Sequence, residues 1–378
     1  MEKEQAAKFM QDLLRHMRAK GASDLFITAD FPPAMKIDGK VTPVSAQVLT
    51  AQHTKELARS IMNDRQAEEF EATKECNFAI SPGTLGRFRV NAFMQQSRVG
   101  MVLRTINSEI PRLSELGLPP VLQDIAMTKR GLVIFVGGTG SGKSTSLAAM
   151  IGHRNESSYD HIITIEDPIE YVHEHKNCIV TQREVGVDTD SWGAALKNTL
   201  RQAPDVILIG EIRDRDTMDY AIAFAETGHL CMATLHANSS NQALDRIINF
   251  FPEERRAQLL MDLSLNLKAF VSQRLLPHRS GKGRVAAVEV MLNSPLISEL
   301  VFKGEVHEIK EIMKKSRELG MQTFDQSLFD LYEAGKVSYE DALRNADSVN
   351  DLRLQIKLQG SEAKQKDVLS GIDHLDIV

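Results

Sequence analysis

The sequence predicts an α/β protein with two main domains, and three observations support this prediction. The chain has 378 residues, more than one ordinary domain contains, and its 42% hydrophobic and 25% charged residues are typical of a globular protein with a large core. Residues 1–106 combine short strands with amphipathic helices, the pattern of a small α/β domain with an antiparallel sheet. After residue 130, apolar strands alternate with helices, which indicates a mostly parallel sheet covered by helices.

The first domain is expected to begin with a helix over residues 6–18, where apolar side chains recur on one face. Asp38-Gly39 predicts a tight hairpin turn. Thr50 can cap a second helix, which we expect to run over residues 51–71. The strands of this domain are predicted over residues 23–28, 34–37, 76–80, 87–94 and 101–106.

Residues 107–130 are predicted to be a linker, because three prolines and Gly117 are too many breakers for a single element. A short helix around residues 121–127 leads into the second domain, whose core is expected over residues 131–295. Within this core, the strands after the first are predicted over residues 162–165, 179–181, 206–209 and 230–235, and two helices over residues 191–202 and 216–227. From residue 241 the pattern is mainly helical, with a hairpin-like interruption at residues 279–290. Residues 296–358 are the expected helical C-terminal region, and the polar residues 359–378 predict a disordered tail.

The stretch Leu132–Thr145 predicts a phosphate-binding loop in a strand–loop–helix setting. Five apolar residues form the strand, glycines turn the chain, and good helix formers follow. Glycines allow several backbone N–H groups to converge on a polyphosphate, Lys143 can reach its β- and γ-phosphates, and the Ser144 hydroxyl can ligate Mg²⁺. The chain is therefore expected to bind a nucleoside triphosphate with Mg²⁺ through Gly137, Gly138, Thr139, Gly140, Ser141, Gly142, Lys143, Ser144 and Thr145.

Carboxylates follow two of the predicted buried strands, where an NTPase needs groups for the metal and for water. Glu166, Asp167 and Glu170 follow the strand over residues 162–165, and Glu211 follows the next strand but one. Ligands of open α/β sheets lie beyond the carboxyl ends of strands, which is where these acids fall. Because residue 210 is glycine, we expect Glu211 to hold the metal, through a water. The alternative is that these acids are solvated or cap helices.

Two histidines, His229 and His236, bracket the predicted strand over residues 230–235. They could bind zinc with Cys231, contact the nucleotide or make structural hydrogen bonds. Their spacing matches no zinc site, and the residues alone favour the structural role. The three cysteines are scattered, so we expect neither zinc nor disulfides.

Composition also excludes several classes of protein. No run of about 18 apolar residues is present, and the N-terminal residues have no apolar signal core, so a cytoplasmic location is expected. The formal net charge of −6 and the lack of a basic–aromatic stripe disfavour nucleic acid as a partner, and with it a DNA translocase.

Together these motifs resemble the Walker A, Asp box, Walker B and His box of the secretion-superfamily ATPases, over residues 20–358. The four boxes are Gly137–Thr145, Ile165–Glu170, Ile209–Asp214, and Thr227-Gly228-His229 with His236. Within that superfamily the chain resembles the type IV pilus retraction ATPases of the PilT/PilU family, and most closely its PilU branch. The segments that carry this likeness are Gly86–Val90, Thr181–Gly186, Leu200–Asp205 and Asn345–Leu354.

The resemblance implies a PAS-like domain over residues 1–106, a RecA-like ATPase core over residues 131–295, and a homohexamer. It places Glu170 on the catalytic glutamate, Glu211 on the Walker B acid, and both histidines on nucleotide-contacting positions. It also places Arg89 and Arg104 on arginines that reach the phosphates when the domains close, whereas the alternative for both is a solvated strand face.

The function that the resemblance implies is ATP hydrolysis by a hexameric motor that retracts type IV pili for twitching motility. A sister PilT ATPase and the pilus platform protein of the inner membrane are the implied partners, at the cytoplasmic face of that membrane. The segment Pro295–Val301 departs from the PilT pattern, so an accessory subunit that depends on a PilT motor is a second hypothesis. A pilus-assembly or type II secretion ATPase is a third, disfavoured because those relatives usually carry a four-cysteine zinc insert.

Overall fold

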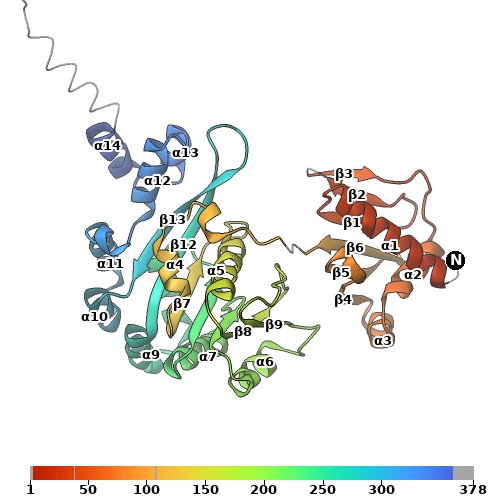
Figure 1. Cartoon of the computed structure of the whole chain (residues 1–378), viewed down its shortest axis with the longest axis horizontal. Helices are drawn as coiled ribbons and strands as arrows, with labels where there is room; N and C mark the ends of the chain where they lie inside the picture. Colours follow the sequence, from red (N-terminus) through yellow and green to blue (C-terminus); the bar gives the residue numbers. More distant parts are fainter. Residues whose placement is uncertain (1–2, 38, 107–108, 361–378) are drawn as a thin grey trace, which may run out of the picture. The chain divides into compact units, whose positions relative to one another are not determined.

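The computed structural model describes residues 3–37, 39–106 and 109–360, which form two compact units (Figure 1). The first unit comprises Met1–Glu109 with two later segments, Asp167–His173 and Arg183–Ser191. The second comprises Ile110–Glu166, Glu174–Gln182 and Trp192–Val378. The domain boundaries expected from the sequence stay predictions, and the predicted tail beyond residue 360 lies outside the described residues.

The first unit is a six-stranded antiparallel sheet with three helices. Its strand order is β3-β2-β1-β6-β5-β4. Its core is formed by the apolar faces of the helices and by alternate residues of the central strands. Apolar residues recur about every 3.6 positions in the helices and every second position in the strands, so each element turns one apolar face to the core. The elements are α1 (Lys3–Ala19), α2 (Ala51–Ile61), α3 (Asp64–Thr73), β1 (Asp24–Ile27), β2 (Ala34–Ile37), β3 (Lys40–Pro43), β4 (Glu75–Ile80), β5 (Phe88–Gln95) and β6 (Arg98–Thr105).

One helix prediction in this unit is half right. Thr50 caps α2 as expected, its hydroxyl accepting a hydrogen bond from the His53 N–H at 3.2 Å. The single helix expected over residues 51–71 is wrong, because Asn63 starts a new helix. Its side chain accepts from the Gln66 N–H and the Gln66 side chain accepts from the Asn63 N–H, both at 2.9 Å. This reciprocal capping box competes with continuation of α2.

The second unit contains a seven-stranded sheet in the order β13-β12-β7-β11-β10-β8-β9. The five strands from β12 to β8 run parallel, and β13 is antiparallel to β12. The carboxyl ends of β7, β11, β10 and β8 therefore meet at one edge, which is where parallel sheets place their ligands. The strands are β7 (Gly131–Val136), β8 (His161–Glu166), β9 (Ile179–Glu184), β10 (Val206–Ile209), β11 (Leu230–Leu235), β12 (Leu267–Pro277) and β13 (Arg284–Leu292).

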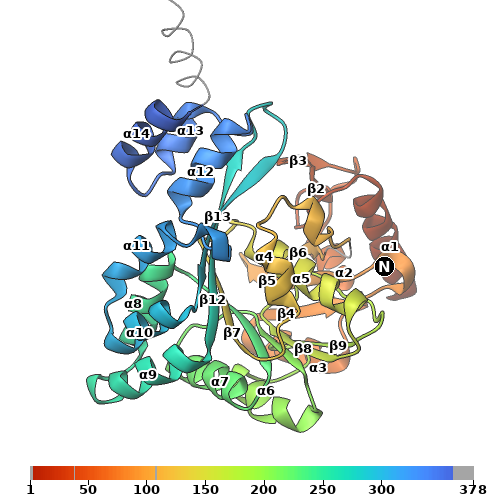
Figure 2. The same ribbon diagram turned by 60° about the vertical axis from the view of Figure 1, so that its left-hand side comes forward.

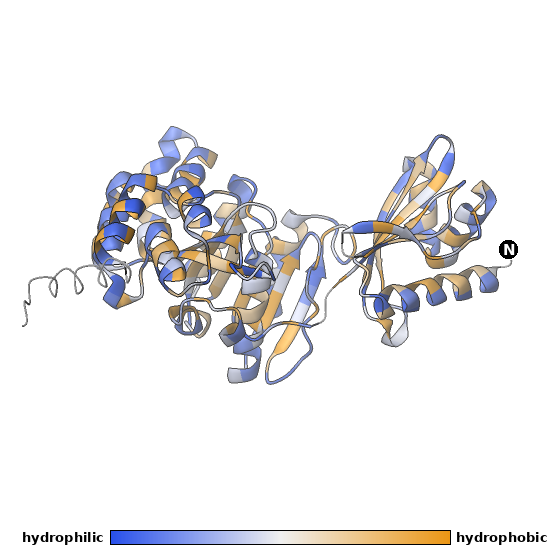
Figure 3. Ribbon diagram, turned by 90° about the horizontal axis from the view of Figure 1, so that it is seen from above, coloured by the Kyte–Doolittle hydropathy of each residue, from blue (hydrophilic) through white to orange (hydrophobic). Residues whose placement is uncertain are grey.

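Helices cover this sheet, and its central strands are fully buried. β7, β10 and β11 bury every residue, and Figure 3 shows strands with orange, hydrophobic residues between helices that carry many blue, hydrophilic residues. α4 and α5 contribute to one core cluster with β7, while α7 packs on β7 and β11 (Figure 2). The helices are α4 (Val121–Ala126), α5 (Lys143–Ser157), α6 (Trp192–Thr199), α7 (Arg215–Glu226), α8 (Ser240–Phe250) and α9 (Glu253–Asn266).

Strand β12 corrects the expectation of a mainly helical chain after residue 241. Residues 267–277 form a long strand that pairs with β7 on one side and β13 on the other. The hairpin-like interruption predicted at residues 279–290 is thus the turn and most of the second strand of a longer β12–β13 pair. The run Leu267–Leu276 contains buried aromatic and β-branched residues, which favour a strand. Its position between β7 and β13 stabilises the strand conformation over a helix.

The remaining helices form the C-terminal region, and the last three of them pack on the hairpin, whereas α10 packs on α9. Buried Phe324, Leu328 and Leu352 share a small core with Leu276 of β12 and Ala287 of β13. Figures 1 and 2 both show α12–α14 beside this hairpin. The helices are α10 (Pro295–Lys303), α11 (Ile309–Lys314), α12 (Phe324–Glu333), α13 (Tyr339–Arg344) and α14 (Val349–Gln359). Within the described part of the chain, no helix is long and apolar enough to cross a membrane.

Candidate functional site

The predicted phosphate loop connects β7 to α5, and its glycines are required by close packing. Gly137 has φ +155°, and a Cβ there would lie 2.7 Å from the Gln273 carbonyl oxygen of β12. Gly142 has φ +90°, and a Cβ there would lie 2.6 Å from the Gln273 side-chain nitrogen. At Gly137 the close neighbour is a backbone atom, so any other residue there would push the loop off β12. At Gly142 the neighbours are side-chain ends that can move, and the positive φ is what favours glycine.

The loop presents donors that suit an anion. Lys143 is only 8% exposed, and its Nζ donates to the carbonyl oxygens of Gly137 and Gly138 at 2.7 and 2.9 Å. The buried Ser141 hydroxyl makes no hydrogen bond within the described residues. Lys143, Ser144 and Thr145 open α5, whose first N–H groups have no partner inside the helix. This set of donors fits a polyphosphate, and the Ser144 hydroxyl is a suitable Mg²⁺ ligand beside it.

Gln273 is a site residue that the sequence reasoning missed. It is 3% exposed, its side-chain oxygen accepts from the Ser146 hydroxyl at 2.8 Å, and both loop glycines pack against it. It lies more than 120 residues after the loop. No local motif marks it, because its role comes only from the pairing of β12 with β7.

Glu211, which follows β10, is joined to one of the predicted histidines. Its Oε1 lies 3.2 Å from His236 Nε2, and its Oε2 accepts from Arg213 Nε at 2.8 Å. Gly210 precedes it because a Cβ at that position would lie 3.1 Å from the Glu166 Cα atom. The structure therefore brings Glu211 and His236 together at the carboxyl edge of the sheet, where β7 and the phosphate loop also end.

The two histidines lie at opposite ends of β11. His236 follows the strand, whereas His229 precedes it, roughly 20 Å away for seven residues of extended chain. The His229 Nδ1 lies 3.0 Å from the Thr227 hydroxyl and 3.2 Å from the Phe224 carbonyl oxygen. His229 is thus bound to the end of α7 and is not brought to the phosphate-loop edge. Its nucleotide-binding role stays a prediction.

The three acids at the end of β8 and after it lie in different units of the structure. Glu166 accepts from the Thr164 hydroxyl at 2.6 Å and from the Gln182 amide at 3.3 Å, within the second unit. Asp167 and Glu170 lie in the segment assigned to the first unit, and both are exposed. This segment is held by the buried Glu184 side chain, which accepts a hydrogen bond from the Ile169 N–H at 3.3 Å. Glu184 is not among the site residues predicted from the sequence.

Arg89 and Arg104 face each other across β5 and β6 in the first unit. They are directly opposite in register, and Arg104 is also opposite Asp24 of β1. Arg104 Nε donates to Asp24 Oδ1 at 2.8 Å, while Arg89 has no ion pair or side-chain hydrogen bond among the residues described. Two like charges placed opposite each other destabilise a sheet, and Asp24 offsets this charge for Arg104.

An open depression of about 680 Å³ lies beside the phosphate loop in the second unit. Gly138 forms one side of it, and His236, Ala237 and Asn238 form another, with one face of α8 completing the wall. Among the described residues, no group of three or more His, Cys, Asp or Glu side chains could hold a metal ion. A Mg²⁺ ion at Ser144 and Glu211 would therefore take further oxygen ligands from phosphate and water.

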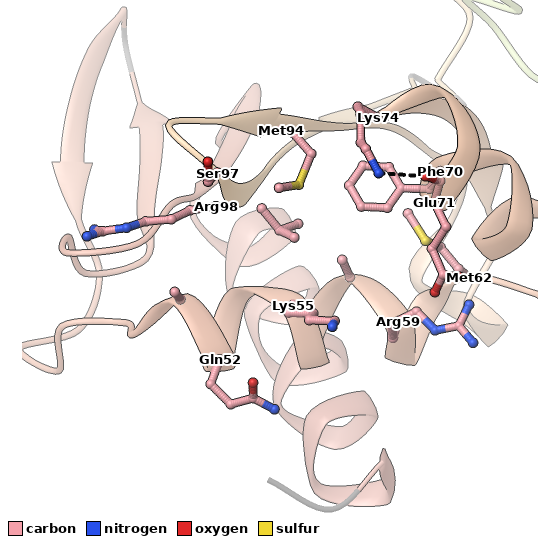
Figure 4. A pocket seen from close by; sticks show the side chains of 13 residues that line it. Gln52, Lys55, Arg59, Met62, Phe70, Glu71, Lys74, Met94, Ser97 and Arg98 are labelled. Carbon is pink, nitrogen blue, oxygen red and sulfur yellow. Dashed lines mark hydrogen bonds between the residues drawn. The ribbon is translucent and has the colours of Figure 1, made fainter.

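A second cavity, of about 370 Å³, lies in the first unit between α2, α3 and the β5–β6 hairpin (Figure 4). Met62, Phe70 and Met94 form its apolar lining, and Lys55 and Arg59 extend along its rim. None of the predicted site residues lines it.

Comparison with known proteins finds pilus and secretion ATPases that match almost the whole chain. The family model described as type II/IV secretion system protein matches residues 2–344. The type IV pilus ATPase PilU of Pseudomonas aeruginosa is 63% identical over 365 residues, covering 97% of this chain and 94% of that protein. The type IV pilus retraction ATPase PilT of the same organism is 42% identical, covering 89% of this chain and 97% of that protein.

A solved structure shows the same architecture. The crystal structure of the pilus retraction motor PilT with bound ADP has a TM-score of 0.85 and 38% identity, covering 91% of this chain and 98% of that one. The predicted fold class is confirmed: an N-terminal PAS-like α/β domain precedes a RecA-like ATPase domain with a helical C-terminal region.

Proposed function

Because this chain belongs to the type II/IV secretion system protein family, in its PilT/PilU branch of type IV pilus ATPases, we propose that it hydrolyses ATP to drive pilus retraction. One observation carries the proposal. The glycine-dependent phosphate loop and the Glu211–His236 pair lie at the same edge of the parallel sheet, in a chain that matches pilus ATPases over nearly its full length.

In this proposal each group at the edge has a distinct task. Lys143 binds the β- and γ-phosphates, and Ser144 with Glu211 holds Mg²⁺, which neutralises phosphate charge when bound. His236 orients the Glu211 carboxylate. Glu170 takes the proton from the attacking water, and Arg89 and Arg104 stabilise the charge that develops on the γ-phosphate.

The proposed assembly is a homohexamer at the cytoplasmic face of the inner membrane, where closure and opening of subunits convert hydrolysis into movement. A sister PilT ATPase and the platform protein of the pilus base are its proposed partners. A second candidate function, an accessory subunit that depends on a PilT motor, is favoured by the segment Pro295–Val301, which departs from the PilT pattern in the first turns of α10.

The test is Mg²⁺-dependent ATP hydrolysis by the purified full-length chain, with the oligomer mass measured in parallel. Lys143→Ala and Glu170→Gln should each lower turnover by at least about a hundredfold, as expected for groups that act on the transferring phosphate. Lys129→Ala and Glu174→Gln are matched controls on exposed positions and should retain activity.

Hydrolysis that survives both Lys143→Ala and Glu170→Gln would overturn the proposed function. A hexamer that binds ATP but turns it over only when the sister ATPase is added would support the accessory role instead. Twitching of cells that carry each variant then connects the enzymatic result to retraction.

A further inference from the structure

A buried carboxylate that the proposed mechanism does not use holds the segment after His236. Glu289 of β13 has no exposed surface, and its Oε1 accepts from both the N–H and the hydroxyl of Ser240 at 2.8 Å. The Ser272 hydroxyl of β12 donates to the same oxygen at 3.3 Å. Ser240 is the first residue of α8, so Glu289 fixes the point at which the chain enters that helix.

An arginine of the neighbouring strand holds the same segment two residues earlier. Arg274 of β12 donates to the Asn238 carbonyl oxygen at 3.2 Å. The same guanidinium donates to the Asn345 carbonyl oxygen at 2.5 Å and to Asp347 at 2.8 Å, and its central carbon lies 3.9 Å from the centre of the Phe324 ring. Arg274 therefore connects the segment to α12 and to the connection between α13 and α14.

A lysine from α11 links these two contacts. Lys310 Nζ lies 3.9 Å from Glu289 Oε2 and forms an ion pair with Asp347. Burial raises the pKa of Glu289, and Lys310 opposes that rise only in part. Burial alone would raise the pKa of Asp347, but its hydrogen bonds and ion pairs with Lys310 and Arg274 outweigh burial and lower it. Glu289, Lys310, Asp347 and Arg274 thus form one charged cluster between the sheet and the C-terminal helices.

The segment that this cluster holds belongs to the candidate site. His236 at its start contacts Glu211, and Ala237 and Asn238 line the depression opposite Gly138. Between Leu235 of β11 and Ser240 of α8 the chain has no regular secondary structure. Its position therefore depends on contacts such as those from Arg274 and Glu289, rather than on a helix or a strand.

We propose that Arg274 and Glu289 are positioning residues that hold the segment His236–Ser240, and that Lys310 and Asp347 make this hold depend on the packing of the C-terminal helices. The catalytic consequence rests on the proposed ATP hydrolysis. A shift of about 1 Å in groups that orient a reaction can cost up to about a hundredfold in rate. Movement of α11–α14 would then change turnover without any contact between these helices and the nucleotide.

The test uses the full-length protein with Arg274→Lys, Lys310→Met and Glu289→Ala. Lysine keeps the charge of Arg274 but cannot bridge three partners, because it lacks the planar fork. Glu289→Gln keeps the Oε1 acceptor for Ser240 and is the conservative variant. Arg317→Lys, on an exposed pair with Asp330, and Lys314→Met, on the same helix as Lys310, are the matched controls.

Two readouts are measured, kcat and KM for ATP and the amide hydrogen exchange of residues 235–241. In Arg274→Lys, Lys310→Met and Glu289→Ala we expect faster exchange in this peptide and a fall in kcat of about tenfold or more with little change in KM. Glu289→Gln and both controls should stay close to the wild type. If Glu289→Ala fails to fold, the other two variants decide.

The outcomes separate this inference from the proposed function. If the wild-type chain hydrolyses no ATP, the proposed function fails, and the exchange of residues 235–241 still decides whether the cluster holds the segment. If the variants exchange and turn over like Arg317→Lys and Lys314→Met, the positioning role is wrong. Faster exchange with unchanged kcat would overturn the catalytic consequence.

Discussion

The proposed function assigns cations of both units to the phosphates, and the two units hold these cations in opposite ways. Lys143 of the second unit is 8% exposed and is oriented by the carbonyl groups of its own loop. The Arg104 side chain of the first unit is 70% exposed on a strand, and Arg89 opposite it has no partner among the described residues. Lys143 is therefore held in place before any phosphate binds, whereas Arg104 is paired with Asp24 on an exposed strand and Arg89 beside it is not held by a partner among the described residues.

The largest effect should come from disturbing the preorganised loop. Gly137→Ala places a methyl group 2.7 Å from the Gln273 backbone oxygen, which cannot move without shifting β12. We expect at least about a tenfold loss of nucleotide affinity, because the loop N–H groups would no longer converge on the phosphate. Binding of a fluorescent ATP analogue measures it.

The neighbouring glycine provides the control for this change. A Cβ at Gly138 meets no atom within 4 Å, so Gly138→Ala adds the same methyl group without a clash. Equal affinities for Gly137→Ala and Gly138→Ala would show that contact with β12 does not shape the loop.

An effect of intermediate size is expected when each arginine is replaced, and it should differ between Arg104 and Arg89. Arg104→Ala leaves Asp24, whose side chain is 7% exposed, without its cation and should cost the first unit about 1–3 kcal/mol. Arg89→Ala removes a like charge with no partner and should leave stability unchanged or slightly higher, while turnover falls. Hydrogen exchange of residues 24–27 and ATP turnover measure the two effects. A stability loss of the same size in both variants would contradict the assignment of Arg89 to the ligand.

The contrast also explains how much of the site could be predicted. The phosphate loop and Glu211 are readable because each motif is contiguous and follows its own strand. Gln273, Arg274 and Glu289 are not, because they reach the site from β12 and β13 through pairing of distant segments. The spacing of His229 and His236 already indicates that they do not share one site. The strand between them is extended, so the two histidines lie at opposite edges of the sheet.

In the fold, too, some elements are determined by neighbouring residues in the sequence and others by contacts with distant segments. The capping of α2 by Thr50 follows from local chemistry, and so does the break at Asn63, whose capping box with Gln66 was readable in the sequence. Strand β12 could not be distinguished from a helix by its apolar run alone, since its neighbours in the sheet decide its conformation.

The smallest predicted effect concerns the buried carboxyl group of Glu289 in the second unit. Glu289 has its pKa raised above the ordinary value of 4.5 by burial, so the folded chain keeps a proton that the unfolded chain releases. The free energy of unfolding should therefore fall as pH rises above about 4.5, by at most about 1.4 kcal/mol per pH unit for this one group. Lys310, Asp347 and Arg274 surround the group and limit the rise.

Glu289→Gln removes this proton linkage while keeping the acceptor for Ser240. The variant should gain stability relative to the wild type as pH increases from about 5, because only the wild type must ionise a buried carboxyl. Urea unfolding followed by the fluorescence of Trp192, the only tryptophan, reports on the second unit. A stability difference that is constant with pH would mean that Glu289 ionises as easily in the folded chain as in the unfolded one, and that its contact with Lys310 fully offsets burial.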